Sequence, residues 1–496
     1  MSQLTSSNTE KIQLNTNRHS NLAELLLPEL LVEVFGYCVS GPEDFHDSAI
    51  IRVNEQRARA PFRIAAVCAT WRATAIAHSK LWHYVAIPCI DKPSHCQHHL
   101  EYIETVLKRS RDASIDVIFH FLKDDIQLIQ GHEPLFQALS LHRWKWRRLC
   151  AVMGGPKSVE RVLNLLTEPT PRLRTLDLSR QNTAESWTYR TLNIAEWDQW
   201  FHMPQSSGNL KPVLVYAPAL LHVALVNIPT IWRRLTALRP TLISLDALQE
   251  AYSPEMWDVL DGQPQMEWIH LSARDDPPPI PTDRAVILPT LATLWLNERS
   301  PQFFAENPAF LRTPALKEIV LQIATRIASM RPYLTTVAPH LRALDIRRVA
   351  RMQDEDVNAL ALLVNLQSLV FGSDALITQC LLLRMCAIPE QSRDDTPSDA
   401  VQILWPKLER FEIWYSSFEE HARHLLLDVV RVRGRPAPRS GLHPVSIDLQ
   451  ELSGFTRDQK TELEQITGRT YNIETEDEHT WGAGDIVIAE AAAQRL

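Results

Sequence analysis

Residues 89–99 hold the densest group of side chains that could bind a metal ion. Thiolate and imidazole groups of this kind suit Zn²⁺. Structural zinc sites combine a C-x(2–4)-C pair with an H-x(3–5)-H pair, and this segment lacks that combination. The ligand-type residues here are Cys89, His95, Cys96, His98 and His99. Leu100, Ile103, Val106 and Leu107 follow at helical spacing, so the segment predicts the start of an amphipathic helix and no metal or other cofactor.

Catalytic signatures are missing from the sequence. It contains no GxSxG, GxGxxG, GxxxxGK[ST] or HExxH motif. Glycine is scarce, at 14 of 496 residues, which disfavours loops that cradle phosphate groups. We therefore predict that the chain is not an enzyme.

Composition and charge narrow the classes of partner. The net charge is −8, and the one concentrated basic stretch is "RWKWRR" at 143–148. We interpret Trp144 and Trp146 as packing residues beside solvated arginines, so no nucleic acid is expected. The seven cysteines form no CxxC pair, which favours free thiols in a reducing compartment. Without a secretory signal or a membrane-length apolar run, we expect a cytoplasmic or nuclear protein with no membrane partner.

The apolar stretch "LLLPELLVEVFGYC" at 25–38 predicts a helix near the amino terminus. Pro28 suits a first helical turn, and Glu29 complements the positive end of the helix dipole. Leu31, Val34 and Phe35 recur on one face of that helix. A single short helix cannot bury so wide a stripe on itself.

A second helix is predicted at "PFRIAAVCATWRATAIAHS", with Pro61 in its first turn. Trp71 lies on its apolar face together with Ile64 and Val67. The following "KLWHYVAI" turns into an alternating, strand-like pattern. A pair of ordinary amphipathic helices would give the same periodicity.

The residue identities favour a family. "LPELLVEVF", "VCATWR" and "LW" occur in that order, and together they resemble the F-box motif, covering about a seventh of the chain. In that family the helices dock on the Skp adaptor, which links them to a cullin–RING ubiquitin ligase. The resemblance assigns adaptor binding to Leu27, Pro28, Leu31, Val34, Phe35, Val67, Trp71, Leu81 and Trp82. The intervening segment 40–60 is longer than in the minimal motif and resembles the loop of fungal F-box-like sequences; a helix within it would alter the docking face.

A repeat follows. The stretches "MEWIHL", "LATLWL", "LKEIVL", "LRALDI" and "LQSLVF" begin at 266, 291, 316, 341 and 366, so successive starts differ by 25 residues. "LISLDA", "LLHVAL", "LRTLDL" and "LERFEI" have the same form, and many units are led by proline. We expect the fourth and sixth residues to point into a core and the first leucine to pack at the entry turn. This period is typical of leucine-rich repeats, although a generic parallel α/β domain is the alternative.

The predicted fold is therefore α/β, with a short helical F-box module followed by an irregular leucine-rich-repeat solenoid whose parallel strands line the concave face. The expected boundaries are a disordered terminus at 1–20, the F-box-like module at 21–90, a helical linker or cap at 91–145, the solenoid at 146–452, and a cap with an acidic tail at 453–496. Insertions are expected within 181–210 and near 389–399.

Outward-pointing strand residues should form the cargo surface. They are the third, fifth and seventh residues of each pattern, and tryptophan and arginine among them are typical of binding hot spots. The predicted set is Trp268, His270, Trp295, Asn297, Glu318, Asp345, Arg347, Arg410, Glu412 and Trp414.

The resemblance then implies the function. We expect the substrate-recognition subunit of an SCF-type ubiquitin ligase, a non-catalytic adaptor that holds an unknown protein substrate near the conjugating enzyme. The alternative is a leucine-rich-repeat scaffold with no part in ubiquitylation, whose amino-terminal helices only cap the repeats.

Overall fold

The computed structural model describes seventeen stretches of the chain. They are residues 27–40, 53–88, 93–121, 132–180, 211–235, 242–250, 254–273, 285–322, 326–348, 352–372, 376–386, 404–414, 416–418, 420–434, 444–450, 452–471 and 473–475. The predicted disordered terminus, the insertions at 181–210 and 389–399, Cys89 and most of the acidic tail lie outside them. The structure divides into two compact units, residues 1–242 and 243–496.

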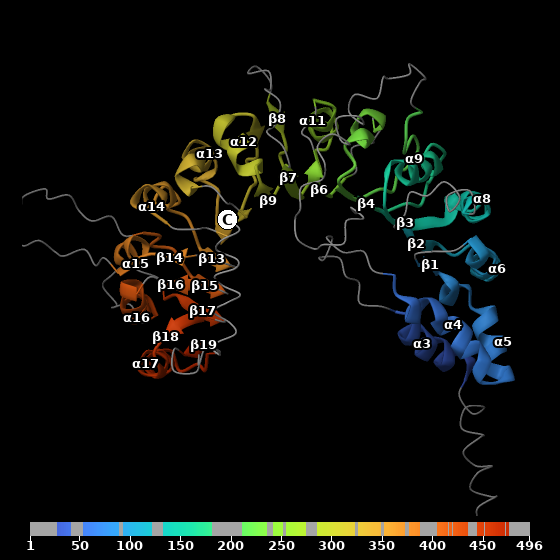
Figure 1. The fold of residues 1–496 in the computed structure, drawn as a ribbon, viewed down its shortest axis with the longest axis horizontal. Coiled ribbons are helices and arrows are strands. Elements are labelled where there is room, and N and C mark those ends of the chain that lie inside the picture. The colour runs from blue at the N-terminus through green and yellow to red at the C-terminus, as the bar shows by residue number, and fades with distance from the viewer. Residues whose placement is uncertain are drawn as a thin grey trace, which may run out of the picture. The chain divides into compact units, whose positions relative to one another are not determined.

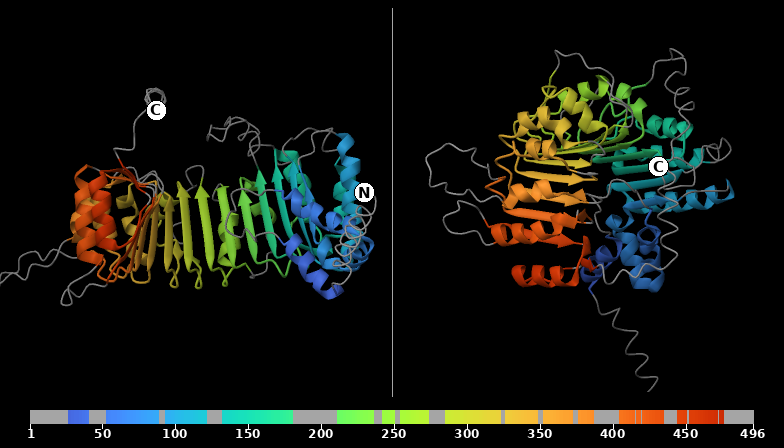
Figure 2. Two further views of the ribbon diagram at one scale, coloured as in Figure 1. Left: turned by 90° about the horizontal axis from the view of Figure 1, so that it is seen from below. Right: turned by 60° about the vertical axis from the view of Figure 1, so that its left-hand side comes forward.

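Both units are α/β and contain parallel strands (Figures 1 and 2). The expected α/β class with a parallel sheet is thus confirmed: among the described residues, five main strands lie in the first unit and eight in the second, and each pairs in parallel with its neighbour inside its unit. No helix in the described ranges has the length and apolar character needed to cross a membrane.

The first unit begins with a helical module. Its elements are α3 (Pro28–Val39), α4 (Glu55–Val67), α5 (Ala69–Ala77) and the 3-10 helix η1 (Ser79–Trp82). The strands are β1 (Tyr84–Ile87), β2 (Ile115–Phe121), β3 (Trp146–Met153), β4 (Thr175–Arg180) and β5 (His222–Val226), in that spatial order. The remaining helices are α6 (Pro93–Ser110), α8 (Glu133–Ser140), η2 (Arg143–Lys145), α9 (Pro156–Leu165) and η3 (Pro229–Arg234).

The second unit repeats a strand-then-helix order. Its main strands are β6 (Ser244–Glu250), β7 (Trp268–Ala273), β9 (Thr293–Glu298), β11 (Glu318–Gln322), β12 (Ala343–Arg347), β13 (Ser368–Gly372), β15 (Arg410–Trp414) and β17 (Ser446–Gln450). The helices are α11 (Pro254–Asp261), α12 (Ser300–Glu306), η4 (Ile327–Met330), α13 (Arg331–Val337), α14 (Asp354–Leu360), α15 (Gln379–Cys386), α16 (Glu420–Gly434) and α17 (Arg457–Thr467). Three short parallel pairs complete it: β8 (Val286–Ile287) with β10 (Leu311–Arg312), β14 (Leu376–Ile377) with β16 (Ser417–Phe418), and β18 (Leu452–Phe455) with β19 (Ile473–Thr475).

The 25-residue period of the sequence is also the number of positions that separates paired residues of neighbouring strands. Thr293 of β9 pairs with Glu318, Glu318 with Ala343, and Ala343 with Ser368, each 25 positions further along the chain. As predicted, the fourth and sixth residues of each pattern are buried, as Leu294 and Leu296 illustrate, and the first leucine, Leu291, is buried in the turn that enters the strand. No strand buries its apolar side chains alone, so each unit of the repeat depends on the next.

Three strands end in the same unusual backbone conformation. Asn227, Glu298 and Arg348 each follow the seventh residue of their pattern and have φ values of 62°, 54° and 58°. This left-handed conformation turns the chain out of the strand, and it costs a residue with a Cβ atom about 1 kcal/mol. The turn is therefore imposed by the strand pairing on either side and does not depend on glycine.

The second predicted helix differs from expectation. It is two helices, α4 and α5, separated at Cys68, whose φ of −155° is extended. Pro61 lies inside α4 and not in its first turn, because α4 begins earlier, capped by the Asn54 side chain that accepts a hydrogen bond from the Arg57 amide at 2.9 Å. The Cys68 sulfur accepts from the Trp71 amide at 3.4 Å and caps α5 in turn.

Residues 91–145, expected as a helical linker or cap, contain a strand as well. The helix predicted from Leu100 onward is present as α6, with Ile103, Val106 and Leu107 buried. After it, β2 pairs in parallel with both β1 and β3. The sheet of the first unit thus starts at β1, directly after the helical module.

Candidate functional site

Four of the nine residues matched to the F-box motif form the interior of the helical module. Leu31, Phe35, Leu81 and Trp82 are at most 2% exposed. The Phe35 ring lies 5.0 Å from the Trp71 ring, and the Trp82 indole N–H donates to the Ala75 carbonyl at 2.8 Å. These contacts fix α3 against α5 and η1, so the module holds together through residues that the motif resemblance assigns to adaptor binding.

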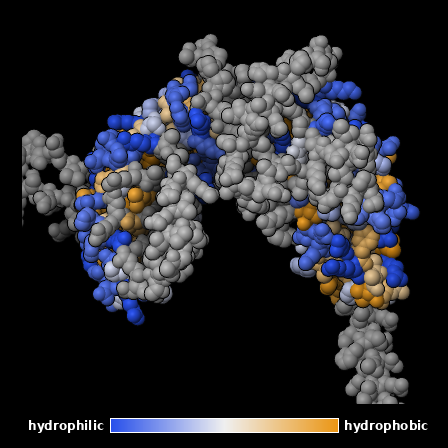
Figure 3. All heavy atoms as spheres, viewed as in Figure 1, coloured by the Kyte–Doolittle hydropathy of each residue, from blue (hydrophilic) through white to orange (hydrophobic). Residues whose placement is uncertain are grey.

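The rest of the apolar pattern faces outward. On α3, Leu27, Leu30, Val34 and Tyr37 are 62%, 52%, 46% and 81% exposed, and we call these four residues the α3 stripe. Their spacing puts Leu30, Val34 and Tyr37 on one side of the helix. Pro28 is exposed, and so is Val67 at the end of α4. Figure 3 shows apolar atoms gathered on the surface of this module.

The opposite side of the module is attached to the sheet. Ala58 of α4 packs into a cluster with Tyr84 and Ala86 of β1, Ile118 of β2 and Cys150 of β3. The Asn54 amide also donates to the Tyr84 hydroxyl at 3.2 Å. Helix α4 therefore covers the start of the sheet, while α3 packs mainly on the other helices and leaves its stripe uncovered by described residues.

A second candidate surface lies on the strands of the second unit. In this unit the described helices cover one face of the strands (Figure 1), and we call the other the helix-free face. Strand pairing puts alternate residues of neighbouring strands in rows on this face: His270 pairs with Trp295, and Ser272 pairs with Asn297. The ten predicted cargo residues all occupy positions in these rows.

The centre of the helix-free face is a linked network. The His270 ring donates through Nδ1 to the Asp246 carboxylate at 2.9 Å and accepts through Nε2 from the Asn297 amide at 2.8 Å. It stacks on Trp295 with ring centroids 4.5 Å apart. The Arg347 guanidinium lies over the same Trp295 ring, 4.8 Å from its centroid. Because both nitrogens of His270 are occupied, the ring is poorly placed to activate a nucleophile, and its role here is to order the surface.

Charges on this face are paired. Arg347 donates to both carboxylate oxygens of Asp345, the shortest contact being 2.7 Å. Arg410 lies 3.3 Å from Glu412 and donates to the Ser368 hydroxyl at 2.8 Å. Burial raises the pKa of Glu412, with Asp448 and Asp345 adding to the rise and Arg410 opposing it.

The tryptophans of the helix-free face keep unused donors. The indole N–H groups of Trp295 and Trp414 are buried and have no hydrogen-bond partner among the described residues. Glu318, by contrast, accepts from the Thr293 hydroxyl at 3.2 Å. The face thus presents rigid aromatic side chains, the type of group enriched at protein interfaces.

Two interpretations of the basic stretch are corrected. Trp146 is buried as expected, but Trp144 is 39% exposed. The arginines are not simply solvated: Arg147 makes a two-pronged ion pair with Asp116, and Arg148 pairs with Asp177 at 2.6 Å. In the residues that the structure describes, no three histidine, cysteine or acidic side chains converge to hold a metal ion.

Comparison with protein-family models and with curated protein sequences gives no match to this chain. The functional assignment therefore depends on the motif resemblance and the geometry described above.

Proposed function

We propose that the chain is a substrate receptor of an SCF-type ubiquitin ligase. In this proposal the amino-terminal helices are an F-box that docks on the Skp adaptor, and the repeating strands form a leucine-rich-repeat region that binds a protein substrate. The observation that carries the proposal is the α3 stripe, an apolar row left outside a module whose own interior is already filled.

The division between interior and stripe supports adaptor docking. Leu31 and Phe35 are completely buried, so the module does not need the stripe to fold. An exposed apolar helix face is unfavourable in water and marks a contact with another protein. Docking of such a face into a groove formed by helices is a common mode of recognition, and the F-box resemblance of this same segment identifies the Skp adaptor as the partner.

The 25-residue offset supports the second half of the proposal. A regular series of parallel strands presents one continuous surface, and its third, fifth and seventh pattern positions vary from unit to unit. Trp295, Arg347 and Trp414 supply the aromatic and guanidinium groups that dominate protein interfaces.

Adaptor binding is the direct test. Leu30→Asp with Val34→Asp places two charges on the stripe without touching the buried core, and we expect the affinity for the Skp adaptor to fall at least roughly thirtyfold, equivalent to about 2 kcal/mol. Leu141→Asp is the matched control, because Leu141 is 70% exposed and lies outside the helical module. Binding is measured by calorimetry with the purified adaptor and the full chain.

Buried residues are less suitable for this test. Phe35→Asp would also abolish binding, but by unfolding the module, since Phe35 is fully buried against Trp71. If the adaptor does not bind the wild-type chain, or binds the stripe variant as well as it binds Leu141→Asp, the receptor assignment is wrong.

One observation favours the scaffold alternative as a second candidate. Helix α4 packs on β1 through Ala58, as a capping helix would. Capping and docking are compatible, because they use different helices of the module. Dependence of ubiquitin-chain formation on residues 27–88, measured on a protein that co-purifies with the full chain, separates a ligase receptor from a scaffold.

A further inference from the structure

A basic cleft lies in the first unit, and we call it the cationic cleft. Its volume is about 740 Å³, within the range of small-molecule sites. It is lined by Ser40, Arg57, Lys80, His83, Ala113, Ser114, Arg147, Pro171, Arg172, Arg174 and Ala219. No lining residue is acidic, and five carry a full positive charge, so the cleft concentrates positive charge.

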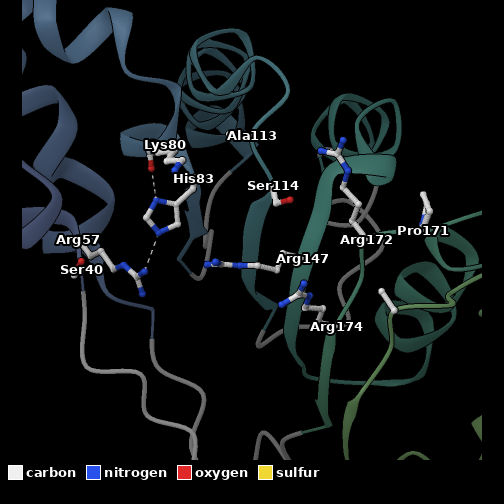
Figure 4. Close-up of a pocket in the computed structure, with 11 residues that line it drawn as sticks. Ser40, Arg57, Lys80, His83, Ala113, Ser114, Arg147, Pro171, Arg172 and Arg174 are labelled. Carbon is white, nitrogen blue, oxygen red and sulfur yellow. Dashed lines mark hydrogen bonds between the residues drawn. The ribbon is translucent and has the colours of Figure 1, made fainter. Parts of the chain in front are cut away.

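The fold builds this cleft from the entry turns of successive strands. His83, Arg147 and Arg174 stand at the starts of β1, β3 and β4. They are adjacent because the strands pair: the His83 carbonyl accepts from the Asp116 amide at 2.7 Å, and the Arg147 carbonyl accepts from the Arg174 amide at 2.7 Å. Figure 4 shows Arg57 of α4 joining them from the helical module, with the Arg147 side chain extended toward His83.

One side of the cleft is held rigidly. Arg57 donates through Nε to the Val39 carbonyl at 2.8 Å and through Nη2 to His83 at 2.9 Å. The other ring nitrogen of His83 lies 2.7 Å from the Lys80 carbonyl and must donate to it. His83 is therefore neutral in this arrangement, and burial, aided by the charges of Arg57 and Arg147, lowers its pKa. Its role is to position Arg57.

The other side keeps unused donors. The side chains of Lys80 and Arg174 are exposed and have no hydrogen-bond or ion-pair partner among the described residues. Arg172 donates through Nη1 to the Asp112 carbonyl at 2.7 Å, and its guanidinium group lies 5.3 Å from the centroid of the Trp144 ring. Cations gathered in this way repel one another, and a bound anion would remove that repulsion.

We propose that the cationic cleft binds a compact ligand that carries at least two phosphate groups. Of the five cations, Arg147 is neutralised by the carboxylate of Asp116, which leaves about four positive charges. Each phosphate group brings roughly 1.5 to 2 negative charges, so two match the cleft and one does not. Arginine side chains also fit phosphate oxygens in a two-pronged geometry.

The two sources of such a ligand are a free polyphosphorylated molecule and a doubly phosphorylated segment of a protein. Sodium tripolyphosphate represents the first, and a peptide with two phosphoserines one residue apart represents the second. Each is titrated by calorimetry into the full chain at physiological ionic strength, with sodium sulfate at equal ionic strength as the reference anion. We expect one-to-one binding of at least one of the two probes, and the probe that binds identifies the source.

Variants distinguish binding at the cationic cleft from nonspecific electrostatic attraction of the anion to the protein surface. Lys80→Ala with Arg174→Ala should weaken binding by roughly tenfold or more, because both groups are charge-assisted donors to the anion. Both side chains are exposed, so the fold should survive, and thermal unfolding checks this. Arg63→Ala is the matched control, since Arg63 is an exposed arginine of α4 that does not line the cleft, and its affinity should equal that of wild type.

Three results would overturn the proposal. They are binding of neither probe, equal weakening in the Arg63→Ala control, and equal affinity for a peptide with glutamates in place of the phosphoserines. The proposal is independent of the ligase assignment. The Leu30→Asp, Val34→Asp variant should bind the phosphate probe normally, so failure of one assignment leaves the other intact.

Discussion

Arg347 on the helix-free face of the second unit and Arg174 in the cationic cleft of the first unit differ in how their side chains are paired. On the helix-free face, Arg347 is stacked on Trp295 and bound to both oxygens of Asp345. In the cleft, Arg174 stands at the start of a strand with no partner for its side chain among the described residues. Parallel strands carry both groups. A position at a strand therefore does not by itself make an arginine part of a binding site. What distinguishes the two arginines is whether nearby groups already pair with the side chain.

Replacing each of the two arginines separately tests this contrast. Arg347→Ala leaves the Asp345 carboxylate, which is 9% exposed, without its donor and should destabilise the second unit by about 2 kcal/mol. Arg174→Ala should change stability by less than about 0.5 kcal/mol, because it removes no described contact and lessens repulsion. Urea unfolding of the full chain, followed by hydrogen exchange of β12 and β4 peptides, measures both. Equal losses would show that the two arginines are equivalent.

The pH dependence of stability should also differ between the units. Burial is the main cause that lowers the pKa of five histidines of the first unit below 6.5: His83, His99, His132, His142 and His222. As pH falls below 6.5, the unfolded chain takes up protons that the folded unit resists, so the first unit loses stability. Glu412 behaves in the opposite way, because its raised pKa means that the folded state holds its proton longer, and its contribution is lost as pH rises above 4.5.

Hydrogen exchange at pH 7.5, 6.0, 5.0 and 4.0, corrected for intrinsic rates, measures these trends on the full chain. Peptides of the first unit should lose protection as pH falls. Glu412→Gln should remove the opposite trend from peptides of β13, β15 and β17 and leave the first unit unchanged. A loss of protection in the first unit that begins only below pH 4.5 would point to carboxylates in place of histidines.

The smallest effect is expected beside Arg347. A Cβ atom added at Gly372 would lie 3.5 Å from the Arg347 Cγ, an ordinary contact distance. Gly372→Ala should therefore change stability by no more than about 0.5 kcal/mol, with the Arg347–Asp345 pair intact. A larger loss of stability in thermal unfolding would mean that the Arg347 side chain cannot adjust at all. The helix-free face would then be more rigid than we expect.

Much of the fold could be predicted because strand packing leaves a periodic trace in the sequence. The alternation around Leu294 and Leu296 and the repeat of 25 residues follow directly from strands that bury every second side chain. The break at Cys68 could not be predicted, because α4 and α5 carry one continuous apolar pattern and only the extended backbone of Cys68 separates them. Pro61 was misplaced for a related reason: Asn54 begins the helix earlier than proline suggests.

The candidate sites also differ in how far the sequence predicts them. The residues of the helix-free face could be predicted, since strand alternation dictates which residues share a face. The split of the apolar helix residues into core and stripe could not, because Leu31 and Val34 lie on neighbouring positions of the same face and only packing against α5 and η1 decides which is covered. The cationic cleft could not be predicted: Arg147 belongs to the basic stretch at 143–148, but the other cations are far apart in the sequence and meet it only when the strands pair and α4 packs beside them.

The constant offset between β9, β11, β12 and β13 has an evolutionary consequence. β9, β11 and β12 each pair on both sides with a strand 25 positions away, and β13 does so on its β12 side. A gene duplication or deletion that spans one such interval would return the flanking strands to partners of the same kind, and each added strand would widen the sheet by about 4.8 Å. Lineages could thus gain or lose sheet area in whole increments without redesigning the remainder of the chain.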